Sequence, residues 1–312
     1  MITKKILFIT GAGASYDFGF PTGQGLINQI INEKWISIGE AKLGIDLLEK
    51  DFDDFKNKLR WSNTPSIDIF IANNPEYADF SKSLIAKIIG EREQKAMEKL
   101  FDESWLKYIW FKMIEGCLNI EDFLNNNNAK FLTFNYDRML EFFFSMSTMN
   151  FFNKETSGMN SVKIFETIPI VHVFGKVGNL PWEDSVKYRL YKDTPGEYLT
   201  WEEVGKELRT IYETKENERH EEIIEMINDS DEIYFLGFGY NTFNLELLDI
   251  DNWADKKYIS GSRYEISRSE LKDINFLHKG KFDNLTIYEH FKCYDFLKND
   301  VLFFANGNSN NQ

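Results

Sequence analysis

The chain is poor in cysteine, in basic residues and in long apolar runs, and each shortage excludes a class of protein. Its two cysteines, Cys117 and Cys293, are 176 residues apart (293 − 117), so the sequence holds neither a disulfide framework nor a zinc site of paired cysteines. No stretch of about eighteen apolar residues occurs, so a membrane-spanning helix is not expected. The apolar run Ile6 to Ile9 leads into glycines rather than a cleavage site, and we expect a cytoplasmic protein.

The charge balance is acidic. Fifty Asp and Glu residues against 36 Lys and Arg residues give a formal charge of −14. That charge repels a phosphate backbone, so no nucleic acid is expected as a direct partner. The 28 phenylalanines have no basic stripe between them and are predicted to be core. No GxxxxGK[ST], GxSxG or HExxH pattern is present, so neither metal chemistry nor a bound metal is expected.

Short β-rich runs alternate with helical periodicity along the chain. This alternation predicts an α/β fold, a Rossmann-like and mostly parallel sheet with helices on both faces. The predicted strands are Lys4–Thr10, Lys130–Phe134, Ile168–Phe174, Glu232–Leu236, Lys257–Ile259 and Leu285–Tyr288.

Two long segments interrupt this alternation. The first is rich in helical periodicity, and the second contains a run expected to be one acidic helix, Glu202–Asn228, whose charges suit a solvated face. The predicted organisation is a sheet domain of residues 1–35 and 129–305, helical insertions at 36–128 and near 180–231, and a disordered tail, 306–312.

A glycine loop, GAGAS at residues 11–15, follows the first strand. Glycine permits a sharp turn and a close approach to a ligand, and the N–H groups that start a helix attract anions, so a pyrophosphate suits this loop. The dinucleotide fingerprint is incomplete because its third glycine position is Tyr16 and no acid closes a second strand about twenty residues later. A tight turn without a ligand is the alternative.

Four short motifs occur in the order that one known family shows. They are GAGASYDFGFPT at 11–22, SIDIF at 66–70, TFNYD at 133–137 and LGFGYNTFN at 236–244. Together they resemble the sirtuin-like superfamily, in particular its bacterial branch of antiphage-defence proteins. The resemblance implies a pocket that binds NAD as substrate and cleaves its nicotinamide–ribose bond.

The resemblance also implies a set of binding residues. The pyrophosphate would be held by Gly11, Ala12, Gly13, Ala14 and Ser15; the nicotinamide ribose would be covered by Phe20, Pro21 and Thr22; and the adenosine side would be lined by Gly237, Phe238 and Gly239. Asp68 could reach the pocket from the helical insertion. It could equally lie in the first turn of a helix that Ser66 caps.

Asn135 is the first candidate for catalysis. It follows a strand, at the edge where α/β sheets bind ligands, and its amide and carbonyl could orient a ribose hydroxyl and a water. Asp137 could stabilise the cationic sugar or orient Asn135. Capping the helix that begins near Met139 is an equal alternative for this residue.

The family histidine stands immediately before a glycine, but Phe174 occupies that position before Gly175 here. His172 lies two residues earlier, and residues i and i+2 of a strand are about 6.6 Å apart in rise. His172 is therefore either the general base for a ribose hydroxyl or water, or a hydrogen-bonded core histidine.

These features predict an NAD hydrolase that releases nicotinamide and ADP-ribose. Sirtuin deacylases carry a four-cysteine zinc module, which two isolated cysteines cannot build, so water is the expected acceptor. The resemblance implies an antiphage effector that depletes NAD, and such an enzyme needs control by self-assembly, as a homo-oligomer, or by a separate sensor protein. The alternative is a catalytically silent module that binds NAD or ADP-ribose and regulates a partner. Hydride transfer is a third hypothesis, but no acidic ribose clamp is found.

Overall fold

One six-stranded sheet organises the protein. The computed structural model describes residues 1–35, 49–152, 158–191, 199–215, 218–263, 266–278, 280, 286–289 and 292–304. The strands are β1 (Ile6–Thr10), β2 (Ala129–Thr133), β3 (Ile170–His172), β4 (Glu232–Leu236), β5 (Tyr258–Arg263) and β6 (Thr286–Glu289). Their order is β3-β2-β1-β4-β5-β6, with every neighbouring pair parallel. The predicted α/β fold and its six strands are confirmed.

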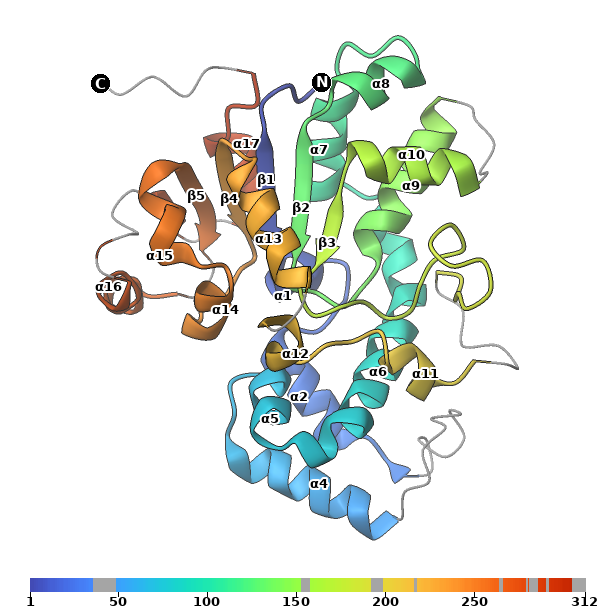
Figure 1. Ribbon diagram of the computed structural model, residues 1–312, viewed down its shortest axis with the longest axis vertical. Helices are drawn as coiled ribbons and strands as arrows, with labels where there is room; N and C mark the ends of the chain where they lie inside the picture. The colour runs from blue at the N-terminus through green and yellow to red at the C-terminus, as the bar shows by residue number, and fades with distance from the viewer. Residues whose placement is uncertain are drawn as a thin grey trace.

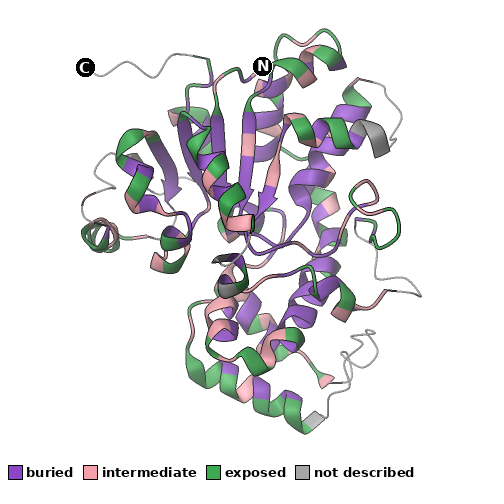
Figure 2. Cartoon of the chain, viewed as in Figure 1, coloured by how far each residue is buried: buried purple, intermediate pink, exposed green. Residues whose placement is uncertain are grey.

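The two central strands are buried from end to end. All five residues of β1 and of β4 are buried, and Figure 2 shows this part of the sheet as continuously buried. Strands covered on both faces are mostly apolar, as Ile6–Ile9 and Ile233–Leu236 are. In Figure 1, α13 (Glu218–Asn228) crosses one face, and α7 (Trp105–Ile114) and α17 (Cys293–Asp300) lie together behind the other.

A group of helices lies beyond the carboxyl ends of the strands (Figure 1). It consists of α2 (Gly23–Asn32), α4 (Glu49–Ser62), α5 (Ile67–Asn73) and the first turns of α6 (Ala78–Leu100). Aromatic rings form its core, with Phe55 5.0 Å from Phe80 and 5.9 Å from Phe70 between ring centroids. These phenylalanines are core residues, as the sequence predicts. The prediction is wrong for six others that are exposed: Phe101, Phe111, Phe151, Phe243, Phe276 and Phe304.

The remaining elements connect the strands. They are α1 (Ala12–Tyr16), η1 (Pro75–Tyr77), α8 (Ile120–Asn126), α9 (Met139–Phe151), α10 (Gly158–Thr167), α11 (Trp201–Gly205), α12 (Ile211–Lys215), α14 (Thr242–Leu247), α15 (Ile250–Trp253), η2 (Ala254–Lys256) and α16 (Arg268–Leu277). Within the described residues, no helix is both long enough and apolar enough to cross a bilayer. The predicted disordered tail, 306–312, lies outside the described residues.

The prediction of a single acidic helix over Glu202–Asn228 is wrong. The structure has three helices there, α11, α12 and α13. Gly205 packs against the backbone of α6, where an added Cβ would lie 2.9 Å from the carbonyl carbon of Lys82. The Arg209 N–H then donates to the Phe174 carbonyl at 2.8 Å. These tertiary contacts hold the backbone between α11 and α12 in a non-helical conformation, although the composition of the segment favours a helix.

A buried ion cluster ties the helical group to the sheet. Arg138, just before α9, donates to both carboxylate oxygens of Glu93 on α6 at 2.9 and 2.7 Å. Arg189, from the connection between β3 and β4, donates to the same carboxylate at 2.8 Å. All three side chains are at most 2% exposed. Removing Glu93 would take this carboxylate from two buried guanidinium groups at once, so the cluster fixes how these segments sit together.

Three glycines bring the loops after β1 and β4 into backbone contact. A Cβ added to Gly11 would lie 2.7 Å from the Gly237 carbonyl oxygen, and one added to Gly13 would lie 2.9 Å from the Gly237 Cα. A Cβ added to Gly237 would lie 2.0 Å from the Ala14 nitrogen. Gly13 N–H also donates to the Gly237 carbonyl at 3.0 Å. Gly237 has φ +55°, which glycine adopts at the least cost. Close packing therefore explains glycine at these positions before any ligand is considered.

We predict that Gly237→Ala lowers the free energy of unfolding by more than about 2 kcal/mol, because its Cβ collides with backbone that cannot retract. Gly239→Ala is the matched control, since an added Cβ there meets nothing within 4 Å; it should stay within about 1 kcal/mol of wild type. Urea unfolding of both variants checks this. Equal stability of the two variants would contradict the packing argument.

Candidate functional site

The loops that follow β1 and β2 are joined by a buried hydrogen-bond network. The Ser15 hydroxyl donates to Asp137 Oδ2 at 2.8 Å. It accepts from Asn135 Nδ2 at 2.9 Å, and the same nitrogen donates to the Gly11 carbonyl at 2.9 Å. Ser15, Asn135 and Asp137 are each at most 9% exposed. The structure thus brings together three of the predicted site residues.

One atom of Asn135 stays without a protein partner. The Gly11 carbonyl only accepts hydrogen bonds, so the Asn135 group that faces it must be the NH₂. Oδ1 therefore faces the other way, and among the described residues this buried oxygen has no hydrogen-bond partner. A buried acceptor without a partner is costly, so a ligand that donates a hydrogen bond would stabilise it.

A small pocket lies beside this network, here named the Asn135 pocket. Its volume is about 80 Å³, room for a few waters at about 30 Å³ each. Of the predicted site residues it is lined by Ala12, Ser15, Phe20, Pro21, Thr22, Asp68, Asn135 and Asp137. It therefore unites the loops after β1 and β2 with α5, at the edge where open α/β sheets bind ligands.

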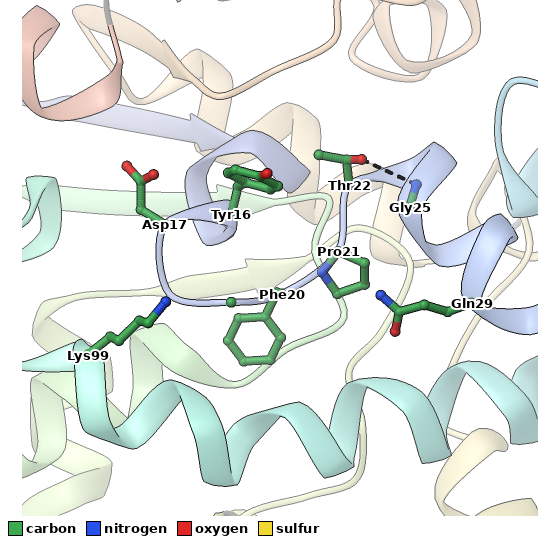
Figure 3. Close-up of a pocket in the computed structure, with 9 residues that line it drawn as sticks. Tyr16, Asp17, Phe20, Pro21, Thr22, Gly25, Gln29 and Lys99 are labelled. Carbon is green, nitrogen blue, oxygen red and sulfur yellow. Dashed lines mark hydrogen bonds between the residues drawn. The ribbon is translucent and has the colours of Figure 1, made fainter.

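A wider pocket, here named the Lys99 pocket, is also lined by the Phe20–Thr22 segment (Figure 3). Its volume is about 420 Å³, within the usual range for ligand sites. Tyr16, Gln29 and Lys99 contribute a ring, an amide and a cation to its lining. Phe20, Pro21 and Thr22 line both pockets.

Asp137 bonds to the start of α9, as the capping alternative predicts, and also to Ser15; its role toward a sugar stays a prediction. Its Oδ1 accepts from the Met139 N–H at 3.2 Å, at the start of α9, while its Oδ2 holds Ser15. Burial raises the pKa of Asp137 to about 6, and the hydrogen bonds from Ser15 and Met139 oppose that rise. This carboxyl group therefore changes its protonation near neutral pH.

Asp68 likewise combines a structural position with a place at the pocket. Ser66 caps α5 by accepting from the Ile69 N–H at 3.3 Å, with Asp68 in the first turn. The Tyr136 hydroxyl donates to Asp68 across the pocket wall. Burial raises the pKa of Asp68, and the bond from Tyr136 opposes it. This bond links the helical group to the loop after β2.

His172 lies outside the lining of both pockets, with protein partners on both ring nitrogens. Nδ1 lies 2.8 Å from the Asn135 carbonyl oxygen, and Nε2 lies 2.8 Å from Glu141 Oε1. The side chain is 4% exposed. This is the environment of the hydrogen-bonded core histidine that the sequence left open, and a role as general base would require one ring nitrogen to leave its partner.

The other predicted binding residues lie in the glycine contact or close to it. Gly11 and Gly13 pack against Gly237, and the Gly13 N–H is already used by the Gly237 carbonyl. The predicted residues that line neither of these two pockets are Gly11, Gly13, Ala14, His172, Gly237, Phe238 and Gly239. Their contact with a nucleotide stays a prediction.

Sequence reasoning did not single out Tyr136, Glu141 and Lys99. Tyr136 lies inside the TFNYD motif itself, and Glu141 is an isolated acid in the apolar run MLEFFF, a pattern that could have indicated a buried, paired charge. Lys99 has no comparable pattern around it. Among the described residues, no group of three His, Cys, Asp or Glu side chains could hold a metal ion.

No family model matches the chain, and no curated protein is found to be similar to it. The resemblance described above therefore depends on the four motifs alone.

The raised pKa of Asp137 predicts a pH-dependent stability difference. Below its ordinary value of 3.8 the carboxyl is neutral in both states, and as pH rises through about 6 the folded protein must bury the charge, so stability is lost. Asp137→Asn removes that cost. Between about pH 3.5 and about pH 8, its free energy of unfolding should rise relative to wild type by on the order of 2–3 kcal/mol. Urea unfolding at both pH values measures this, and a constant difference would contradict it.

Proposed function

We propose that the protein is an NAD hydrolase that releases nicotinamide and ADP-ribose from the pocket beside Asn135. The observation that supports this most directly is the buried, unpartnered Oδ1 of Asn135. Its NH₂ is fixed by Gly11 and Ser15, so the oxygen has a defined direction. An oriented acceptor at the carboxyl edge of the sheet suits a ribose hydroxyl or an attacking water.

The chemistry requires little acid catalysis. The bond between the ribose C1′ and the nicotinamide nitrogen breaks, and its electron pair neutralises the charge of the departing ring. The sugar becomes oxocarbenium-like, so a nearby carboxylate lowers the barrier. Water then forms the new C1′–O bond and loses a proton. We assign the orientation of water and sugar to Asn135, and charge stabilisation and proton acceptance to Asp137, which is ionised above a pKa of about 6.

Binding requires the pocket to widen. The Asn135 pocket, about 80 Å³, is too small for a dinucleotide, whereas the Lys99 pocket is about 420 Å³. Movement of Phe20–Thr22 would join the two and let NAD extend from Asn135 toward Lys99, whose ammonium group suits the pyrophosphate. By resemblance we propose further that the enzyme is an antiphage effector kept inactive until self-assembly or a sensor protein opens the site.

A second candidate is a silent module that binds NAD or ADP-ribose and regulates a partner. The observation that favours it is the engagement of both His172 ring nitrogens by Asn135 and Glu141, which removes the expected general base. Purified protein, alone and with the product of an adjacent gene, distinguishes the two candidates. NAD binding without nicotinamide release in every condition would favour the silent module.

We predict that Asn135→Ala lowers nicotinamide release at least about 100-fold, because the oriented acceptor is lost, while the protein stays folded. Release is followed by chromatography and folding by circular dichroism. The matched control is Asn150→Ala, an exposed asparagine of α9 whose amide donates to the Met146 carbonyl of the same helix; it should keep wild-type activity. Full activity in Asn135→Ala would refute the assignment.

The proposal also predicts a pH profile. Asp137 acts as a carboxylate, so nicotinamide release should fall about tenfold for each pH unit below its pKa of about 6. The measurement is the initial rate of release between about pH 4.5 and about pH 8. Asp137→Asn should be slow at all of these values and lack the inflection. An unchanged inflection in this variant would assign it to another group.

A further inference from the structure

Asn135 is fixed at every polar atom except one. Its backbone N–H donates to Thr133 Oγ1 at 3.1 Å, and its carbonyl oxygen lies 2.8 Å from His172 Nδ1. Its side-chain NH₂ is held by Gly11 and Ser15. Within the part of the chain that the structure describes, its Oδ1 has no hydrogen-bond partner. These bonds hold the Asn135 side chain in one orientation, so that Oδ1 points in a defined direction as a hydrogen-bond acceptor.

The His172 ring is itself held between two acceptors. The Asn135 carbonyl and the Glu141 carboxylate each accept hydrogen bonds and donate none. The two 2.8 Å contacts are therefore both satisfied only when the ring donates from both nitrogens. In that state His172 has no lone pair with which to take a proton from a substrate.

Glu141 and Lys176 complete this arrangement. Glu141 is 2% exposed and lies in the apolar first turns of α9, where a carboxylate is costly to bury. Lys176 Nζ lies 3.3 Å from Glu141 Oε1 and also pairs with Glu183. Burial alone raises the pKa of Glu141, but His172 and Lys176 outweigh it and hold the pKa at about 2. The carboxylate is thus a fixed anion that orients the ring.

We propose that Glu141 and His172 are positioning residues that hold Asn135 through its backbone carbonyl, and that His172 acts as a hydrogen-bond donor rather than a proton acceptor. This inference rests on the proposed function for its effect on catalysis. The positioning of Asn135 is independent of the proposed function, because it can be measured without any ligand.

His172→Asn separates the two roles. An asparagine amide can replace Nδ1–H as donor to the Asn135 carbonyl but cannot act as a base near neutral pH. We expect His172→Asn to keep kcat for NAD hydrolysis within about fivefold of wild type, whereas His172→Ala loses about 10- to 100-fold with KM within about threefold. Glu141→Gln keeps the acceptor for Nε2–H and should also stay within about fivefold. The control is His220→Ala in α13, which should keep wild-type kcat.

The inference is overturned if His172→Asn is as inactive as His172→Ala while both are folded, because a base would then be required. Wild-type activity in His172→Ala would overturn it too.

A ligand-free measurement distinguishes failure of this inference from failure of the proposed function. In ¹⁵N-labelled protein the Asn135 side-chain NH₂ resonances are identified by their loss in Asn135→Ala. We expect these protons to exchange with water slowly in wild type and in His172→Asn, and at least about tenfold faster in His172→Ala. Unchanged exchange in His172→Ala would overturn the positioning role, whether or not the wild type consumes NAD.

Discussion

The candidate site depends on the two hydrogen bonds of the Ser15 hydroxyl. It accepts from Asn135 and donates to Asp137, and so joins the loop after β1 to the loop after β2. Ser15 reaches this place because α1 starts directly after β1. The contact of Gly11 and Gly13 with Gly237 fixes where that helix starts. The glycines therefore shape the site indirectly, by permitting close backbone packing that any larger residue would prevent.

Two buried carboxylates near Asn135 have opposite electrostatic environments. Glu141 faces His172 and Lys176, which lower its pKa to about 2, whereas Asp137 faces a hydroxyl and an N–H, so burial dominates and raises its pKa to about 6. Groups whose pKa values are separated in this way can take different roles in one site. Glu141 is a constant anion that holds structure, and Asp137 is able to exchange a proton near neutral pH.

The helical group contributes residues of α2 and α5 to the lining of the Asn135 pocket. Asp68 of α5 bonds to Tyr136 beyond β2, and Phe20–Thr22 separates a small pocket from a larger one. The Glu93–Arg138–Arg189 cluster holds α6 against the sheet domain at the same time. The proposed binding of NAD would require Phe20–Thr22 to move while the hydrogen-bond network of Ser15, Asn135 and Asp137 keeps its position.

The sequence by itself determined the sheet. Apolar runs such as Ile6–Ile9 and Ile233–Leu236 are typical of buried parallel strands, and their alternation with helical segments indicates an α/β fold. It also placed Asn135, Asp137 and Ser15 at strand ends, and parallel strands bring their carboxyl ends to one edge. Only the tertiary structure decided how the segment 202–228 divides and what surrounds His172. Those outcomes depend on contacts with residues distant in the chain, such as Gly205 against Lys82 and His172 against Glu141, which no local pattern encodes.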